Sequence, residues 1–85
     1  MDDILERLQA VLREVFGDDE IVVTEATTAD EIDGWDSLMH VRIIIAVEKR
    51  FGVKFAAAEI AALNSEGQNL GNFCQLLSRK LAAKR

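Results

Sequence analysis

The chain has 85 residues, 49% of them hydrophobic, a formal net charge of −5 and a single cysteine. This length suits one small domain, so we expect residues 1–85 to form a single domain. The acidic balance argues against nucleic-acid binding, which needs a basic surface. The lone cysteine excludes an internal disulfide, and the start "MDDILERL" lacks the basic and apolar regions of a secretory signal. No apolar run approaches the ~20 residues that cross a bilayer, so we expect no membrane span. We also expect a cytoplasmic protein and a monomer.

A first amphipathic helix is predicted to end at Gly17, because glycine is a typical helix terminator. Its apolar residues repeat at helical spacing and comprise Ile4, Leu5, Leu8, Val11, Leu12, Val15 and Phe16. Residues 17–36 follow as a long acidic connection, and loops of this length are often functional. The apolar residues 21–23 have no second strand to pair with, so we expect them to pin this loop onto the core.

Three more helices are predicted after the long connection. A helix that is apolar on most faces spans residues 37–51 and ends at Gly52, and its expected core side is Leu38, Val41, Ile45 and Phe51. A short helix over residues 57–63 and a last helix over residues 70–83 are separated by the turn "NSEGQN" at 64–69. The last helix is expected to bury Phe73, Leu77 and Leu81. The fold class is all-α, a small four-helix bundle with three long helices, a short third helix and a long first loop.

Charge changes sign along the chain at Ser37. Residues 1–36 hold 12 Asp/Glu and two Arg, a net of −10, whereas residues 37–85 hold three Glu and eight Lys/Arg, a net of +5. Either Asp36 or Ser37 is predicted to cap the second helix. A hydroxyl at a helix N-terminus is exposed beside outward-pointing N–H groups, which favour an anion such as a phosphodiester. Capping does not exclude modification, so the Ser37 hydroxyl is also a candidate site for a covalent group.

The stretch "DGWDSLMHVRIIIAVEKRFGVKF", followed by "AAAEIAAL" and a closing amphipathic helix, resembles an acyl carrier protein of the phosphopantetheine-attachment family. The resemblance covers essentially the whole chain and is most specific at "DSL", with a valine three residues on. It implies that Ser37 receives 4′-phosphopantetheine from coenzyme A through a separate transferase, and that the thiol of this arm carries acyl groups as thioesters. Asp36 would be the acid that the transferase recognises, and Leu38 would be an apolar docking residue.

Such a carrier is not an enzyme. The resemblance implies a phosphopantetheinyl transferase and acyl-loading, condensing and acyl-transfer enzymes as partners, in fatty acid, lipid or polyketide-type biosynthesis. Two other functions stay open from the sequence: an aminoacyl or peptidyl carrier, and an unmodified helical interaction module. A hydrolase built on Ser37 and His40 is disfavoured, because the chain has no G-x-S-x-G elbow. His40 and Cys74 alone are too few ligands for a metal ion.

Three further side chains could have either a structural or a functional role. His40 is expected to be partly exposed on the second helix, where it could touch a partner. Trp35 is either an anchor for the loop or a binding-site aromatic residue. Cys74 is expected to pack in the core rather than to react, since buried free cysteine is common.

The expected docking helix departs from the family pattern in its charge. Many fatty-acid-type carriers have acids along this helix, whereas residues 37–51 hold one acid and three basic residues. The acids crowd the preceding loop instead. We therefore expect a specialised stand-alone carrier with dedicated enzymes, recognised through Asp36, Leu38, Met39, Val41, Arg42, Asp30 and Asp33.

An acyl pocket is the other surface that the resemblance implies. In this family the growing chain can lie between the helices, mainly beside the second and third. The candidate lining residues are Val41, Ile45, Ile60 and Leu63, and the alanines of the third helix would leave room. The same four residues could instead form the core. The "NSEGQN" turn is longer than usual, and we expect it to reshape this pocket or a partner contact.

Overall fold

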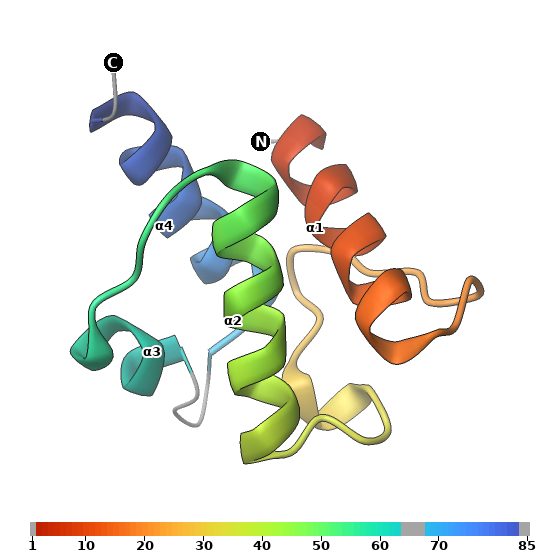
Figure 1. Ribbon diagram of the computed structural model, residues 1–85. Coiled ribbons are helices and arrows are strands. Elements are labelled where there is room, and N and C mark those ends of the chain that lie inside the picture. Colours follow the sequence, from red (N-terminus) through yellow and green to blue (C-terminus); the bar gives the residue numbers. More distant parts are fainter. Residues whose placement is uncertain (1, 64–67, 84–85) are drawn as a thin grey trace.

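The computed structural model describes residues 2–63 and 68–83 (Figure 1). Its elements in chain order are α1 (Asp2–Phe16), the single 3-10 turn η1 (Ala29–Glu31), α2 (Ser37–Phe51), α3 (Ala57–Leu63) and α4 (Leu70–Ala83). Within these two ranges there is no strand. The all-α class, the three long helices and the short third helix are therefore confirmed, while η1 was not predicted.

The core lies where α1, α2 and α4 meet. Helices α1 and α2 lie side by side and run in opposite directions, and α1 also contacts α4 (Figure 1). Each fully buried aliphatic side chain in such a core stabilises the fold by roughly 1.5–3 kcal/mol. The buried set comprises Leu8, Val11, Leu12, Val23, Ile43, Ile44, Val47, Phe51, Val53, Phe55, Leu70, Phe73, Cys74 and Leu77.

Two glycines end the first two long helices, as predicted. Gly17 follows α1 with a φ of 65°, and Gly52 follows α2 with a φ of 68°. This left-handed conformation is disfavoured for residues that have a Cβ atom. The N–H of Gly52 donates to the carbonyl of Glu48 and satisfies one of the last carbonyls of α2.

The predicted core side of α2 was wrong. Leu38, Val41 and Ile45 are 65%, 48% and 48% exposed, and only Phe51 of the predicted set is buried. The buried face consists of His40, Ile43, Ile44, Val47 and Phe51. Apolar residues occupy nearly every face of this helix, so its periodicity could not select one of them. Packing against α1 and the shared core determines which face is buried, and it leaves an apolar strip on the surface.

The long loop is held to α1 by apolar and polar contacts. Val23 is buried and its N–H donates to Gln9 Oε1 at 2.9 Å. Arg13 Nε donates to the carbonyl of Ile21 at 2.7 Å. The prediction that residues 21–23 pin the loop is confirmed for Val23, whereas Val22 is 75% exposed.

The same loop also satisfies the start of α4. The N–H groups of Leu70 and Gly71 donate to the carbonyls of Thr27 and Glu25, at 2.9 and 2.8 Å. A Cβ at Gly71 would lie 3.1 Å from the Glu25 carbonyl oxygen, so any larger residue here would have to push the Glu25 backbone away by a few tenths of an ångström. The loop before α2 is thus held by contacts with both α1 and α4.

The remaining predictions for the C-terminal half are largely confirmed. Phe73 and Leu77 are buried on α4, but Leu81 is only partly buried because it lies near the end of the helix. No residue of α3 is fully buried. Residues 64–67 of the predicted turn lie outside the described residues. The expectation that this longer turn reshapes the pocket or a partner contact concerns those residues and stays a prediction.

Candidate functional site

Ser37 is the first residue of α2 and its side chain is exposed. The N-cap is Asp36, which has extended backbone angles and whose Oδ1 accepts a hydrogen bond from Met39 N at 2.8 Å. The predicted cap is therefore confirmed and is assigned to Asp36. Such a cap contributes about 1 kcal/mol to helix stability. Because Asp36 caps the helix, the Ser37 hydroxyl is not used in the cap and is available for modification.

The first turn of α2 offers donors beside that hydroxyl. The Met39 N–H is taken by Asp36, and the His40 N–H donates to the Asp36 carbonyl at 2.8 Å. Within residues 2–63 and 68–83, the backbone N–H groups of Ser37 and Leu38 have no hydrogen-bond acceptor. Free N–H groups and the helix dipole together favour an anion at this end of a helix.

A tight turn delivers the chain to Ser37. Gly34 has a φ of 88° and its carbonyl accepts the N–H of Asp36 at 3.1 Å. The Trp35 ring packs on Phe16 of α1 with centroids 6.1 Å apart. Its indole Nε1–H donates to His40 Nδ1 at 3.2 Å. Trp35 is therefore an anchor of the loop, one of the two alternatives that the sequence left open.

His40 is buried at 3% exposure, which corrects the expectation of a partly exposed residue. Its Nδ1 accepts from Trp35, so Nε2 carries the proton and donates to the Ile60 carbonyl at 3.1 Å. These two partners remove the cost of burying a polar ring. Both ring nitrogens are engaged, so His40 is not a base for Ser37. The sequence carried one signal of this role, a single histidine placed between the apolar residues Met39 and Val41.

The predicted recognition residues form two adjoining surfaces that meet at Ser37. Asp30, Asp33 and Asp36 are exposed on the loop. Leu38, Val41 and Arg42 are exposed on α2, whereas Met39 is half-buried against the core. The acidic loop and the mixed apolar and basic face of α2 are thus distinct surfaces on either side of the candidate attachment residue.

The four predicted pocket residues differ in their surroundings. Ile60 and Leu63 of α3 pack partly buried against the core. Val41 and Ile45 are about half exposed on α2, and Ile45 lines a groove that faces α1. The α3 alanines, Ala57, Ala58, Ala61 and Ala62, are exposed rather than packed between helices.

Cys74 is fully buried in the core, as predicted. Burial raises the pKa of its thiol to about 11, with a smaller contribution from the charge of Glu25. A thiol that stays protonated is a poor nucleophile. Among the described residues, no helix is long and apolar enough to span a membrane.

Comparison with known proteins connects this geometry to a family. The family model described as the phosphopantetheine attachment site matches residues 6–77. The chain belongs to this phosphopantetheine-attachment family. A solved structure, the solution NMR structure of a holo acyl carrier protein from Geobacter metallireducens, is 41% identical to the chain and superposes with a TM-score of 0.83. That match covers 95% of this chain and 88% of the other. A search of curated proteins found no match.

As a member of this family, the chain is a carrier and not an enzyme. Its cofactor is covalently attached 4′-phosphopantetheine. The residues present fit such a group, because an exposed hydroxyl lies beside two N–H groups without an acceptor in the described chain. The fold of four helices agrees with the acyl carrier protein that it matches.

Proposed function

We propose that the chain carries acyl groups on 4′-phosphopantetheine attached to Ser37, between enzymes of fatty acid, lipid or polyketide-type biosynthesis. One observation supports this most strongly: Ser37 presents a free, exposed hydroxyl at the start of α2, while Asp36 supplies the cap. The family match spans this position. When attached, the arm supplies a terminal thiol that holds acyl groups as thioesters.

The chain's own residues prepare the site without activating it. The N–H groups of Ser37 and Leu38 and the positive end of the α2 dipole favour the negative charge of a phosphodiester. Trp35 and His40 hold the loop against α2, which keeps the hydroxyl at the surface. No base is paired with Ser37 among the described residues, so a separate phosphopantetheinyl transferase must activate the hydroxyl.

Recognition is proposed to involve both surfaces beside Ser37. Asp36 is exposed, and only its Oδ1 is used in the cap, so its charge stays available to the transferase. Asp30 and Asp33 extend this acidic surface. The enzymes that load, extend and unload the cargo would contact α2 through Leu38, Met39, Val41 and Arg42.

Acyl cargo is preferred to aminoacyl cargo because the matched solved structure is an acyl carrier protein. The proposed pocket for that cargo keeps Val41, Ile45, Ile60 and Leu63 as its lining. We also propose that residues 1–85 act as a single, monomeric domain with dedicated enzymes, and that the compartment is the cytoplasm.

The mass of the protein recovered from its native cell tests this proposal. We expect an intact mass increased by one phosphopantetheine, alone or with an acyl group, and fragmentation should locate the increase at Ser37. An added aminoacyl mass would favour the aminoacyl carrier instead. A protein that is never modified, even in cells that make the transferase, would favour the interaction module.

A further inference from the structure

One face of α2 combines apolar and basic side chains that are all exposed. Leu38, Val41, Arg42, Ile45 and Lys49 recur at spacings of three and four residues, which places them along one stripe of the helix. Among the described residues, four large hydrophobic side chains are exposed, and three of them belong to this stripe. A row of exposed apolar residues beside a modification site marks a surface that contacts another molecule.

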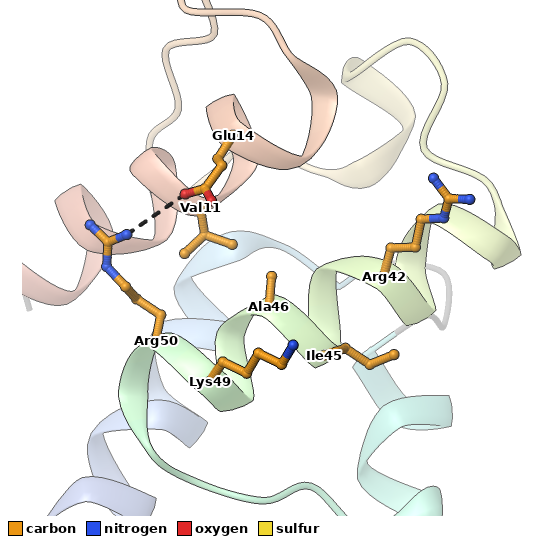
Figure 2. Close-up of a pocket in the computed structure, with 7 residues that line it drawn as sticks. All are labelled: Val11, Glu14, Arg42, Ile45, Ala46, Lys49 and Arg50. Atoms are coloured by element: carbon orange, nitrogen blue, oxygen red, sulfur yellow. Dashed lines mark ion pairs between the residues drawn. The ribbon is translucent and has the colours of Figure 1, made fainter.

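A groove runs beside this stripe, between α2 and α1 (Figure 2). Its volume is about 520 Å³. Figure 2 shows Val11 of α1 and Ala46 of α2 facing one another across it, with Arg42, Lys49 and Arg50 projecting from α2. The groove is therefore apolar at its floor and mostly basic at its rim.

The positive charge of this rim is only partly neutralised. Arg50 Nη1 lies 3.8 Å from Glu14 Oε2, and both side chains are well exposed, so this ion pair is weak. In the part of the chain that the structure describes, Arg42 and Lys49 form no ion pair. These two cations are thus available to carboxylates from outside the chain.

From this arrangement we infer that the α2 stripe and groove dock on a partner protein that surrounds an apolar patch with acidic side chains. The inference rests on the proposed function, because the partner is an enzyme that acts on the arm at Ser37. Carboxylates opposite Arg42 and Lys49 would steer and orient the complex. Leu38, Val41 and Ile45 would supply the apolar burial at its centre.

The acidic loop argues against an anionic membrane as the occupant. Asp30, Asp33 and Asp36 are exposed beside the N-terminal end of the stripe, and an anionic bilayer would repel them. A protein surface can place opposite charges against each of the two regions. The basic stripe and the acidic loop together therefore fit a protein surface better than an anionic membrane.

A second copy of the chain is the other occupant to consider. A groove near Val22 has acidic residues at its rim, namely Asp18, Glu31 and Asp33. Docking α2 of one copy there would be a head-to-tail contact, which continues into open chains unless it closes into a ring. A carrier must visit several enzymes as a free molecule, so we favour an enzyme partner.

The test compares two forms of one partner. The probe is a condensing enzyme of fatty acid synthesis with a basic carrier-docking surface, together with a variant whose docking lysines and arginines are changed to glutamate. The carrier is titrated calorimetrically as wild type, as Arg42→Glu/Lys49→Glu, and as Lys54→Glu/Arg79→Glu. The last variant has the same change in net charge at exposed residues elsewhere. All four sites are exposed, and thermal unfolding checks that each variant is folded.

We expect wild type to bind the acidic enzyme at least about tenfold more tightly than the basic one. Arg42→Glu/Lys49→Glu should reverse this preference, and Lys54→Glu/Arg79→Glu should keep it. Equal effects of the two double variants, or no preference in wild type, would overturn the inference. Asp30→Asn/Asp33→Asn is titrated in the same way, and a larger loss of affinity for the acidic enzyme in this variant than in Arg42→Glu/Lys49→Glu would also overturn the inference. Binding to phosphatidylserine vesicles, or self-association, that is abolished by Arg42→Glu/Lys49→Glu would overturn it as well.

The outcome is separate from that of the proposed function. Each titration is run on the chain before and after treatment with the transferase and coenzyme A, and its mass is recorded. Failure to load Ser37 counts against the proposed function alone, because the charge preference of α2 is still measured on the unloaded chain.

Discussion

The indole N–H of Trp35 donates to Nδ1 of His40 across 3.2 Å, and His40 Nε2 donates in turn to the carbonyl of Ile60. These two hydrogen bonds connect the loop before Ser37, the helix α2 and the short helix α3. The imidazole is buried, so each of its nitrogens needs a partner. The position of the candidate attachment site and the position of α3 therefore depend on the same side chain.

Replacing Trp35 with Phe should loosen the loop while keeping its ring against Phe16. The change leaves the buried Nδ1 of His40 without a donor, and we expect a loss of about 1–3 kcal/mol in the free energy of unfolding. Hydrogen exchange of the amides at residues 32–37 should also accelerate. Unchanged stability and unchanged exchange in this segment would show that the hydrogen bond holds nothing in place.

Two substitutions at Asp36 separate its cap from its charge. Asn retains a capping oxygen, so Asp36→Asn should change the stability by only a few tenths of a kcal/mol, whereas Asp36→Ala should cost about 1 kcal/mol. Both variants lose the carboxylate, so we expect both to be loaded more slowly by the transferase. Stability is measured by urea unfolding and loading by intact mass against time. Normal loading of Asp36→Asn would remove Asp36 from the recognition surface.

The ion pair of Glu59 with Lys80 should make the fold sensitive to acid. Lys80 Nζ lies 2.7 Å from Glu59 Oε1, which also accepts the Ala56 N–H, and these bonds lower the pKa of Glu59 from 4.5. Because the pKa of Glu59 is lower in the folded chain than in the unfolded chain, its carboxylate stabilises the fold at pH values above the unfolded-state pKa. This stabilisation is lost as the pH falls through the folded-state pKa. Stability should therefore drop more steeply below about pH 4.5 in wild type than in Glu59→Gln. Parallel curves for the two proteins would refute this role.

Cys74 should make the fold sensitive to alkali. Its pKa is raised by burial from 9.0 to about 11, so the unfolded chain loses the thiol proton first. The contribution of the protonated thiol to the free energy of unfolding is complete below pH 9.0 and is lost as the pH rises to about 11. Urea unfolding of wild type and of Cys74→Ala across this range isolates the effect, because other groups titrate in both proteins. Rapid alkylation of the folded protein by iodoacetamide at pH 8 would contradict a buried, protonated thiol.

Local signals in the sequence define the ends of α2 well. An acidic cap at Asp36 and a glycine at Gly52 act through neighbouring backbone groups, so the boundaries and the exposed Ser37 follow from a few adjacent residues. The turn η1, which was not predicted, has a comparable local signal. Glu31 lies three residues after Thr28, and its side chain accepts the Thr28 N–H at 2.8 Å, the arrangement of a capping box.

Contacts between distant residues could not be predicted in the same way. The buried face of α2 is determined by its packing against α1 and the shared core, and the apolar residues on its other faces make the helix pattern ambiguous. Burial of His40 depends on Ile60, which is 20 residues away in sequence. For the same reason the helix pattern placed Leu38, Val41 and Ile45 on the core side, although the resemblance to the family also made Leu38 and Val41 candidates for partner contact, which agrees better with their exposure.

Loading of the purified protein tests the central claim most directly. The chain is incubated with coenzyme A and a phosphopantetheinyl transferase of broad specificity, and its intact mass is measured for wild type, Ser37→Ala and Ser78→Ala. Ser78 is an exposed serine on α4 and provides the matched control. We predict one added phosphopantetheine on wild type and on Ser78→Ala, and none on Ser37→Ala. An unchanged mass for wild type, or equal loading of Ser37→Ala, would contradict the assignment of Ser37 as the attachment site.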